Sequence, residues 1–282
     1  MASSGLEALL DTARVAPDRA ARSPWVGRLA RVGLVAKGVS YALVGVLAAA
    51  LAIQGAGKAT SREGALAVLA DETYGAAVVI ALGLGFAAYA AWRLVQAIFD
   101  RDGEGSDSKG IAKRAGYFGR AVIYGGLAYA AFEMLDGTGD GTSQNQEARE
   151  ATAYVLDWPA GRWLVVLAAL ALVGVGFFNA FRGLTQKFEE KWDTSRMSDA
   201  ARRWVGRLSA LGLLARFVVF GLIGAFLLRA AYRYDPSEAI GLDGALQKVA
   251  QAAYGPVLLG IVSAGLLCYA LFCLAEARYR RV

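Results

Sequence analysis

The sequence predicts an all-α integral membrane protein with six transmembrane helices, arranged as three parallel two-helix repeats. Three observations lead to this class: 56% of the 282 residues are hydrophobic, six apolar stretches are of spanning length, and one motif recurs three times. About 20 apolar residues cross a bilayer core of about 30 Å, and a soluble chain of this length would have to bury six such stretches. The 34 glycines also suit transmembrane helices, whose backbones pack closely at small residues.

The predicted elements follow one another with polar segments between them. Residues 1–24 hold no apolar run of signal-peptide length and are predicted to be a cytoplasmic N-terminal segment. Trp25 and Arg28, which come next, suit an amphipathic stretch in the headgroup zone. The transmembrane helices are expected near residues 32–54, 75–99, 112–135, 161–184, 208–230 and 255–277.

Internal repetition groups these helices into units. Residues 25–37, WVGRLARVGLVAK, match residues 204–216, WVGRLSALGLLAR, at eight of thirteen positions without a gap. A short amphipathic segment also precedes the second helix of each unit, at residues 64–75, 150–161 and 244–255. Such repetition predicts a fold built from copies of one supersecondary unit.

The repeats divide the single membrane domain into residues 25–101, 102–192 and 193–282. Each unit crosses the membrane twice, so all three units have the same orientation. The three hairpins could close around a pseudo-threefold axis, or they could lie side by side.

The third unit carries strings that are specific to one known family. It contains DPSEAIGLDGAL, AYGPVLLG and YALFCLAEARYRR. Through these strings the chain resembles, over about residues 25–281, the bacterial family called domain of unknown function 1206. The resemblance implies three repeats of a two-helix membrane unit. It implies no reaction, ligand or site residue.

The distribution of basic residues predicts the topology. The N-terminal and C-terminal regions, with regions 93–120 and 182–216, hold 23 of the 30 lysines and arginines. Because cytoplasmic segments are enriched in basic residues, we expect both termini in the cytoplasm and the protein in a bacterial inner (plasma) membrane. The net charge of +6 then predicts contact with anionic phospholipid and no nucleic-acid partner.

The candidate ligand-binding site contains three cations, one inside the first helix of each unit. Each cation lies four residues before an aromatic residue. The segments read GLVAKGVSY, GYFGRAVIY and GLLARFVVF, and each begins with a glycine four residues before its cation. Residues four apart lie on one helix face, and a cation at membrane depth costs about 3 kcal/mol. The candidate residues are Lys37, Arg120, Arg216, Tyr41, Tyr124 and Phe220.

Two interpretations of these cations stay open at this point. Long basic side chains can reach the headgroups and bind a lipid phosphate. Alternatively the stripe faces the protein interior and attracts an anion, since the small residues one turn away favour helix contact.

The residue content gives no support for an enzyme, a cofactor or a metal site. Histidine is absent, and Cys268 and Cys273 are five residues apart on one predicted helix, which is unsuitable for a metal pair. No phosphate loop or dinucleotide motif occurs. In the DPSEA string, Asp235 or Ser237 is expected to cap a short helix.

As function, the sequence favours a channel- or transporter-like protein for a small anion or anionic solute, whose cavity the three cations line. The alternative is a structural or accessory membrane protein that binds anionic phospholipid and partner proteins. The two differ in whether the cations face a cavity or lipid. A homo-oligomer is compatible with either.

Overall fold

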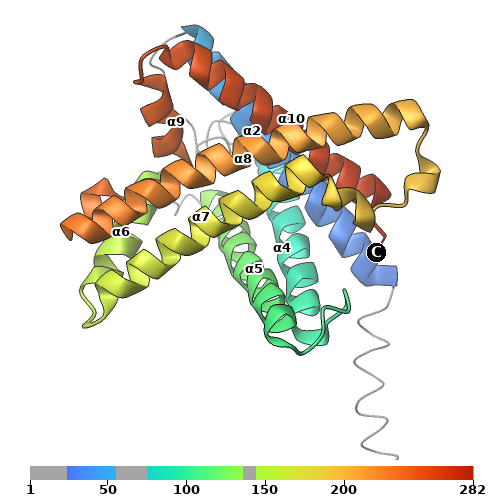
Figure 1. Ribbon diagram of the computed structural model, residues 1–282, viewed down its shortest axis with the longest axis horizontal. Coiled ribbons are helices and arrows are strands. Elements are labelled where there is room, and N and C mark those ends of the chain that lie inside the picture. The colour runs from blue at the N-terminus through green and yellow to red at the C-terminus, as the bar shows by residue number, and fades with distance from the viewer. Residues whose placement is uncertain (1–23, 55–74, 136–143, 282) are drawn as a thin grey trace, which may run out of the picture.

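The computed structural model describes residues 24–54, 75–135 and 144–281, and in these ranges the chain is helical and has no strands (Figure 1). The long helices lie where the sequence predicts them. Two of them begin about eight residues earlier than expected, because the amphipathic stretches before the predicted spans continue the same helix. The bounds are α2 Pro24–Gln54, α4 Gly75–Phe99, α5 Ser108–Leu135, α7 Gly161–Thr185, α8 Asp199–Arg233 and α10 Gly255–Tyr279.

Five of these helices, all but α5, are long and apolar enough to cross a membrane, which indicates a multi-pass membrane protein. The sequence predicted six such helices. In α5, the segment 116–129 contains four glycines, three tyrosines and Arg120, and these residues lower its mean hydropathy.

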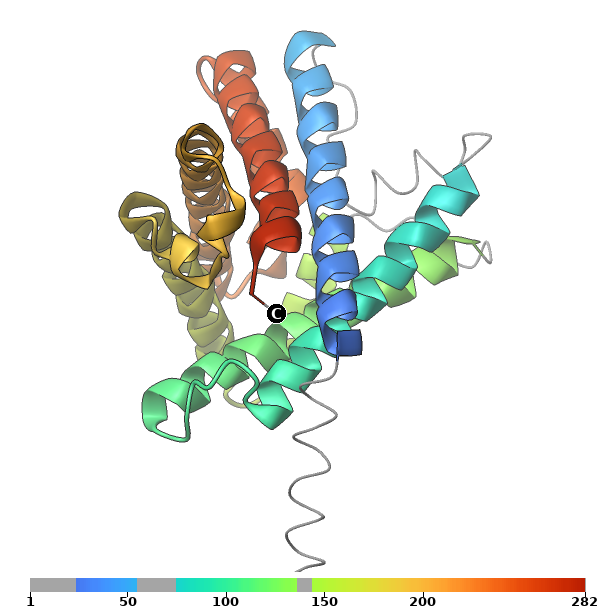
Figure 2. The ribbon, with the colours of Figure 1, turned by 90° about the vertical axis from the view of Figure 1, so that its right-hand side faces the viewer.

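The most extensive helix pairings join different units, not the two helices of one unit. α4 packs along α5, α7 along α8, and α10 along α2, so the first and last long helices are neighbours (Figures 1 and 2). Within units, α2 packs on α4, and α8 packs on α10, over a smaller area. The helices of the middle unit, α5 and α7, have little contact with each other.

The connections between units meet at one end of the molecule, which we call the connection end. The segment 100–107 joins α4 to α5, and the short helices η1 Lys187–Lys191 and η2 Thr194–Arg196 join α7 to α8. The backbone after α10 pairs with the second connection: Asp193 N–H donates to the Tyr279 carbonyl at 2.7 Å, and Arg281 N–H donates to the Lys191 carbonyl at 3.0 Å.

Short helices lie between the two long helices of a unit. They are α6 Gln144–Leu156 and α9 Leu242–Ala250, with η3 Pro236–Glu238 before α9. They overlap two of the predicted amphipathic segments. Of the third, residues 64–75, all but Gly75 lie outside the described residues. The predicted cap is confirmed, because the Asp235 side chain accepts the Ser237 N–H at 2.9 Å.

Candidate functional site

The two helices of the first unit and the two helices of the third unit cross in the same way. This crossing positions the cation of each unit beside a tyrosine of the partner helix. A Cβ added at Gly33 of α2 would lie 2.5 Å from the Tyr89 Cα of α4. The same addition at Gly212 of α8 would lie 2.5 Å from the Tyr269 Cα of α10. Only glycine allows backbones this close. Gly33 and Gly212 therefore let their helices pack directly against the tyrosine of the partner helix.

Lys37 lies in the protein interior, among tyrosine rings. Its side chain is 6% exposed, and its ammonium is 5.2–5.9 Å from the ring centroids of Tyr89, Tyr124 and Tyr269. These rings come from α4, α5 and α10, so all three units contribute to its surroundings. The ring faces attract the ammonium electrostatically.

Arg216 occupies the equivalent position in the third unit. Its Nη1 donates a 2.6 Å hydrogen bond to the Tyr269 hydroxyl. Its guanidinium carbon lies 4.4 Å from the Phe220 ring centroid and 5.6 Å from that of Tyr41. Its Nε is buried and has no hydrogen-bond partner. A buried donor without an acceptor is uncommon and costly.

Arg120 of the middle unit is half-buried and lies within electrostatic range of Arg93 and Arg216. Its guanidinium carbon is 5.9 Å from the Tyr117 ring centroid. The aromatic residues of different units also contact one another: the ring centroids of Tyr41 and Tyr269 are 4.6 Å apart, and those of Tyr89 and Tyr124 are 4.4 Å apart.

The structure therefore brings the six sequence-predicted site residues into one central cluster. We call it the cation–aromatic cluster, and it also includes two tyrosines that the sequence analysis did not assign to the site. Its members are Lys37, Arg120, Arg216, Tyr41, Tyr124, Phe220, Tyr89 and Tyr269.

A hydrogen-bonded chain leads from this cluster to the connection end. Both Nε and Nη2 of Arg93 donate to the Tyr89 hydroxyl, at 3.0 and 2.8 Å, and Nη1 donates to Gln96 Oε1 at 2.8 Å. Gln96 Nε2 then donates to Asp102 Oδ1 at 2.7 Å. The chain consists of buried polar groups that satisfy one another, which gives it a fixed geometry.

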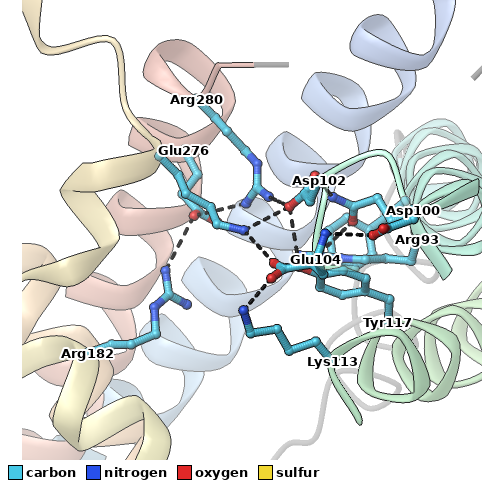
Figure 3. A network of polar contacts seen from close by, with 12 residues as sticks. Arg93, Asp100, Asp102, Glu104, Lys113, Tyr117, Arg182, Glu276 and Arg280 are labelled. Atoms are coloured by element: carbon cyan, nitrogen blue, oxygen red, sulfur yellow. Dashed lines mark hydrogen bonds and ion pairs between the residues drawn. The ribbon is translucent and has the colours of Figure 1, made fainter. Parts of the chain in front are cut away.

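Asp102 is the centre of a polar network that joins all three units (Figure 3). Its Oδ2 accepts from Lys191 at 2.8 Å and from Arg280 at 3.1 Å. Burial by itself raises the pKa of Asp102, but Arg280 and Lys191 outweigh burial and lower this pKa to about 2. The carboxylate is therefore ionised at neutral pH.

Glu104 and Glu276 extend the network. Glu104 accepts from Tyr117 at 2.9 Å and contacts Lys113. Burial raises the pKa of Glu104, but its hydrogen bonds to Lys113 and Tyr117 lower it below the ordinary value. Glu276 of α10 pairs with Arg280 at 3.4 Å and, across helices, with Arg182 of α7 at 3.8 Å.

A cleft of about 270 Å³ lies beside this network at the connection end. It is lined by four basic and two acidic side chains and by Trp92, whose indole N–H is buried and unpartnered. Among the described residues, no group of three or more cysteine, aspartate or glutamate side chains could hold a metal ion.

The repeated helices and the buried cation–aromatic cluster define a class: multi-pass helical membrane proteins built from three copies of a two-helix unit. The family described as Domain of Unknown Function (DUF1206) matches the chain three times, over residues 32–100, 115–186 and 211–280. The chain belongs to this family. These matches confirm the three-repeat organisation, since each covers one pair of long helices.

The chain is also similar to the uncharacterized protein YxxB of Bacillus subtilis (strain 168). The two are 33% identical over 259 residues, which cover 92% of this chain and 93% of the relative. No solved structure matches the chain.

Sequence reasoning identified the cations but missed their tyrosine partners and the Asp102 network. Tyr89 lies in the string AYAAW (residues 88–92) and Tyr269 in the similar string CYALF (residues 268–272) of the second helices of units one and three, so the repeat pattern could have indicated them. Asp102 lies in a polar connection with no fixed spacing to its partners, which are 89 and 178 residues away.

Proposed function

We propose that this protein binds and translocates a small anion or anionic solute across a bacterial inner membrane, with Lys37, Arg120 and Arg216 as the attracting charges. The observation that supports the proposal is the charge imbalance around the cluster. Four cations lie in or beside it, the fourth being Arg93, and among the described residues the carboxylate of Glu276 interacts electrostatically with two of them, Lys37 and Arg93. In a low-dielectric surrounding an uncompensated positive charge favours an anion.

The proposed topology includes α5 as a sixth span, with both termini in the cytoplasm and the connection end facing the cytoplasm. Arg120 and its glycines make α5 less apolar, but its pairing with α4 shields one face from lipid. The three inter-unit pairs are compatible with a pseudo-threefold axis through the cluster. Basic residues concentrated in segments 93–120 and 182–216 support the orientation.

The Arg93–Gln96–Asp102 chain supports a route between the cluster and the connection end. It runs from the guanidinium of Arg93 through the amide of Gln96 to the carboxylate of Asp102, and so leads from Tyr89 to the cleft beside Asp102. An anion leaving the cluster would meet Arg280 and Lys191 at that cleft.

The test is anion flux into liposomes that carry the double variant Arg120→Gln and Arg216→Gln. Glutamine keeps polarity and approximate size and removes both charges, so flux and anion-dependent stabilisation are expected to be lost while insertion is retained. The matched control is Arg31→Gln with Lys109→Gln, because these side chains are exposed and lie on first helices. Flux equal to that of the control would refute the proposal.

A second candidate function is binding of anionic phospholipid by an accessory protein. It is favoured by the half-buried position of Arg120 on a helix that its own unit partner does not cover. In the same liposomes, unchanged flux together with lost binding of phosphatidylglycerol would favour this candidate.

A further inference from the structure

The middle unit lacks a set of contacts that the other two units share. In the first unit, a Cβ added at Gly85 of α4 would lie 2.2 Å from the Ala36 Cβ of α2. In the third unit, a Cβ added at Gly265 of α10 would lie 2.3 Å from the Ala215 Cβ of α8. These pairs, together with the glycine–tyrosine contacts, make one crossing that occurs twice.

Among the described residues, the corresponding glycines of the middle unit have no such contact. Gly119 of α5 corresponds to Ala36 and Ala215, and Gly174 of α7 corresponds to Gly85 and Gly265. A Cβ added at Gly116, Gly119 or Gly174 would have no heavy atom of another described helix within 4 Å. In Figure 1, α5 and α7 run in different directions, in agreement with their small contact.

The aromatic residue of the middle unit that corresponds to Tyr89 and Tyr269 is much more exposed than they are. Phe178 of α7 corresponds to the two cluster tyrosines, because it also lies four residues after the crossing glycine. Tyr89 is 0% exposed and Tyr269 is 1% exposed, whereas Phe178 is 51% exposed.

The cation–ring contact within the unit is also missing. The Lys37 ammonium lies 5.3 Å from the Tyr89 ring centroid, and the Arg216 guanidinium carbon lies 4.5 Å from that of Tyr269. Arg120 has its ring contact with Tyr117 of its own helix and has none with Phe178.

We propose that α5 and α7 form a lateral gate to the cation–aromatic cluster, which is open in this structure and closes by the crossing that the other units show. Glycine is unfavourable inside a helix unless a close approach requires it. In the open form, Gly116, Gly119 and Gly174 take part in no close helix contact among the described residues. In the closed form they allow the two helices to cross closely. Closing then stacks Arg120 on Phe178 and covers the cluster.

The gate opens between two rigid pairs. α4 and α5 pack along each other, as do α7 and α8, so each pair moves as one body. At the connection end, Arg114 of α5 donates to the Ala97 and Ile98 carbonyls of α4 at 2.8 and 2.9 Å, which fixes the first pair. Relative movement of packed bodies about short connections is a common form of gating.

The open gate admits the headgroup of an anionic phospholipid, which extends the proposed function and rests on it. Arg120, on the same face as Gly116, supplies the complementary charge. The adjoining surfaces of α5 and α7 expose apolar side chains suited to acyl chains, among them Ile123, Phe177 and Phe178. A headgroup inserted between the helices prevents their crossing, so anionic lipid favours the open form.

The experiment compares disulfide formation between Gly119→Cys and Gly174→Cys in vesicles of phosphatidylcholine alone and vesicles that also contain phosphatidylglycerol. Cys268 and Cys273 are replaced by alanine. The control pair is Gly83→Cys with Ala131→Cys across α4 and α5, where the Cβ atoms would lie 3.3 Å apart, close to disulfide geometry.

We expect the control pair to cross-link equally in both lipids. The gate pair should cross-link in phosphatidylcholine and at least threefold less with phosphatidylglycerol, and adding Arg120→Gln should remove that lipid effect. Absence of cross-linking of the gate pair in both lipids would overturn the closed form. Cross-linking independent of lipid, or reduced equally by free phosphate, would overturn the lipid occupant. Anion flux that is still lost in the double arginine variant would then leave the proposed function standing without the gate.

Discussion

Replacing Asp102 with asparagine tests whether the polar network at the connection end holds the three units together. The pKa of Asp102 is lowered from 3.8 to about 2, so the folded protein favours the ionised carboxylate. A shift of one pKa unit corresponds to about 1.4 kcal/mol, which gives about 2.5 kcal/mol for this group. Asparagine keeps the shape of the side chain but removes its charge.

In the variant, Arg280 and Lys191 lose the negative charge of Asp102 but each keeps one other carboxylate partner. Arg280 keeps Glu276 at 3.4 Å, and Lys191 keeps Glu104 at 3.3 Å. We expect Asp102→Asn to lower the free energy of unfolding by about 2–3 kcal/mol at pH 7. The assay is thermal unfolding of the detergent-solubilised protein, followed by tryptophan fluorescence.

The pH dependence has a definite sign. Folding lowers the pKa of Asp102, so its contribution is fully present above about pH 4 and is lost as the pH falls toward 2. Wild type should therefore lose more stability than Asp102→Asn between pH 4 and 2. Glu190→Gln, an exposed carboxylate at the same end, is the control and should behave as wild type. Equal unfolding midpoints for Asp102→Asn and Glu190→Gln at neutral pH would refute the reasoning.

Two further predictions concern packing and topology. Gly33→Val places a branched side chain where even a Cβ would lie 2.5 Å from Tyr89, so thermal unfolding should show a loss of about 1–3 kcal/mol or misfolding. With phosphatidylglycerol present, which favours the open form, Gly116→Val should cost less because no other described residue lies near its added Cβ. Equal losses would contradict the structure at α5. In a chain without native cysteines, Ser237→Cys should react with a membrane-impermeant thiol reagent from outside intact cells, and Ser106→Cys only after permeabilisation. The reverse pattern would invert the proposed topology.

The sequence predicted the helices well because their apolar runs are long and bounded by turn residues. The predicted span 75–99 has the same limits as α4, and 161–184 ends one residue before α7 does. The earlier start of α8 was missed because Arg202, Arg203 and Arg207 indicate the end of the apolar span. The helix continues through these residues to begin at Asp199.

The candidate site was predicted only in part. Helical spacing predicted that each cation lies beside the aromatic residue four positions later. Arg216 does lie over the Phe220 ring, but the rings around Lys37 come from three other helices. The Gly33 contact followed from the small-residue pattern, whereas the open position of Gly116 did not, because both glycines stand in equivalent sequence contexts. Contacts that depend on how separate helices are arranged carry no local signal.

The pairing of α2 with α10 determines the order in which the protein can assemble. Ser263 of α10 donates a 2.6 Å hydrogen bond to the Gly45 carbonyl of α2, across 218 residues of chain. During synthesis α2 therefore leaves the insertion machinery long before its neighbour is made. Until then Lys37 lacks the ring of Tyr269, and water or lipid phosphate must solvate its charge. The surroundings of Lys37 can therefore be completed only after α10, the last helix in the chain, has been made.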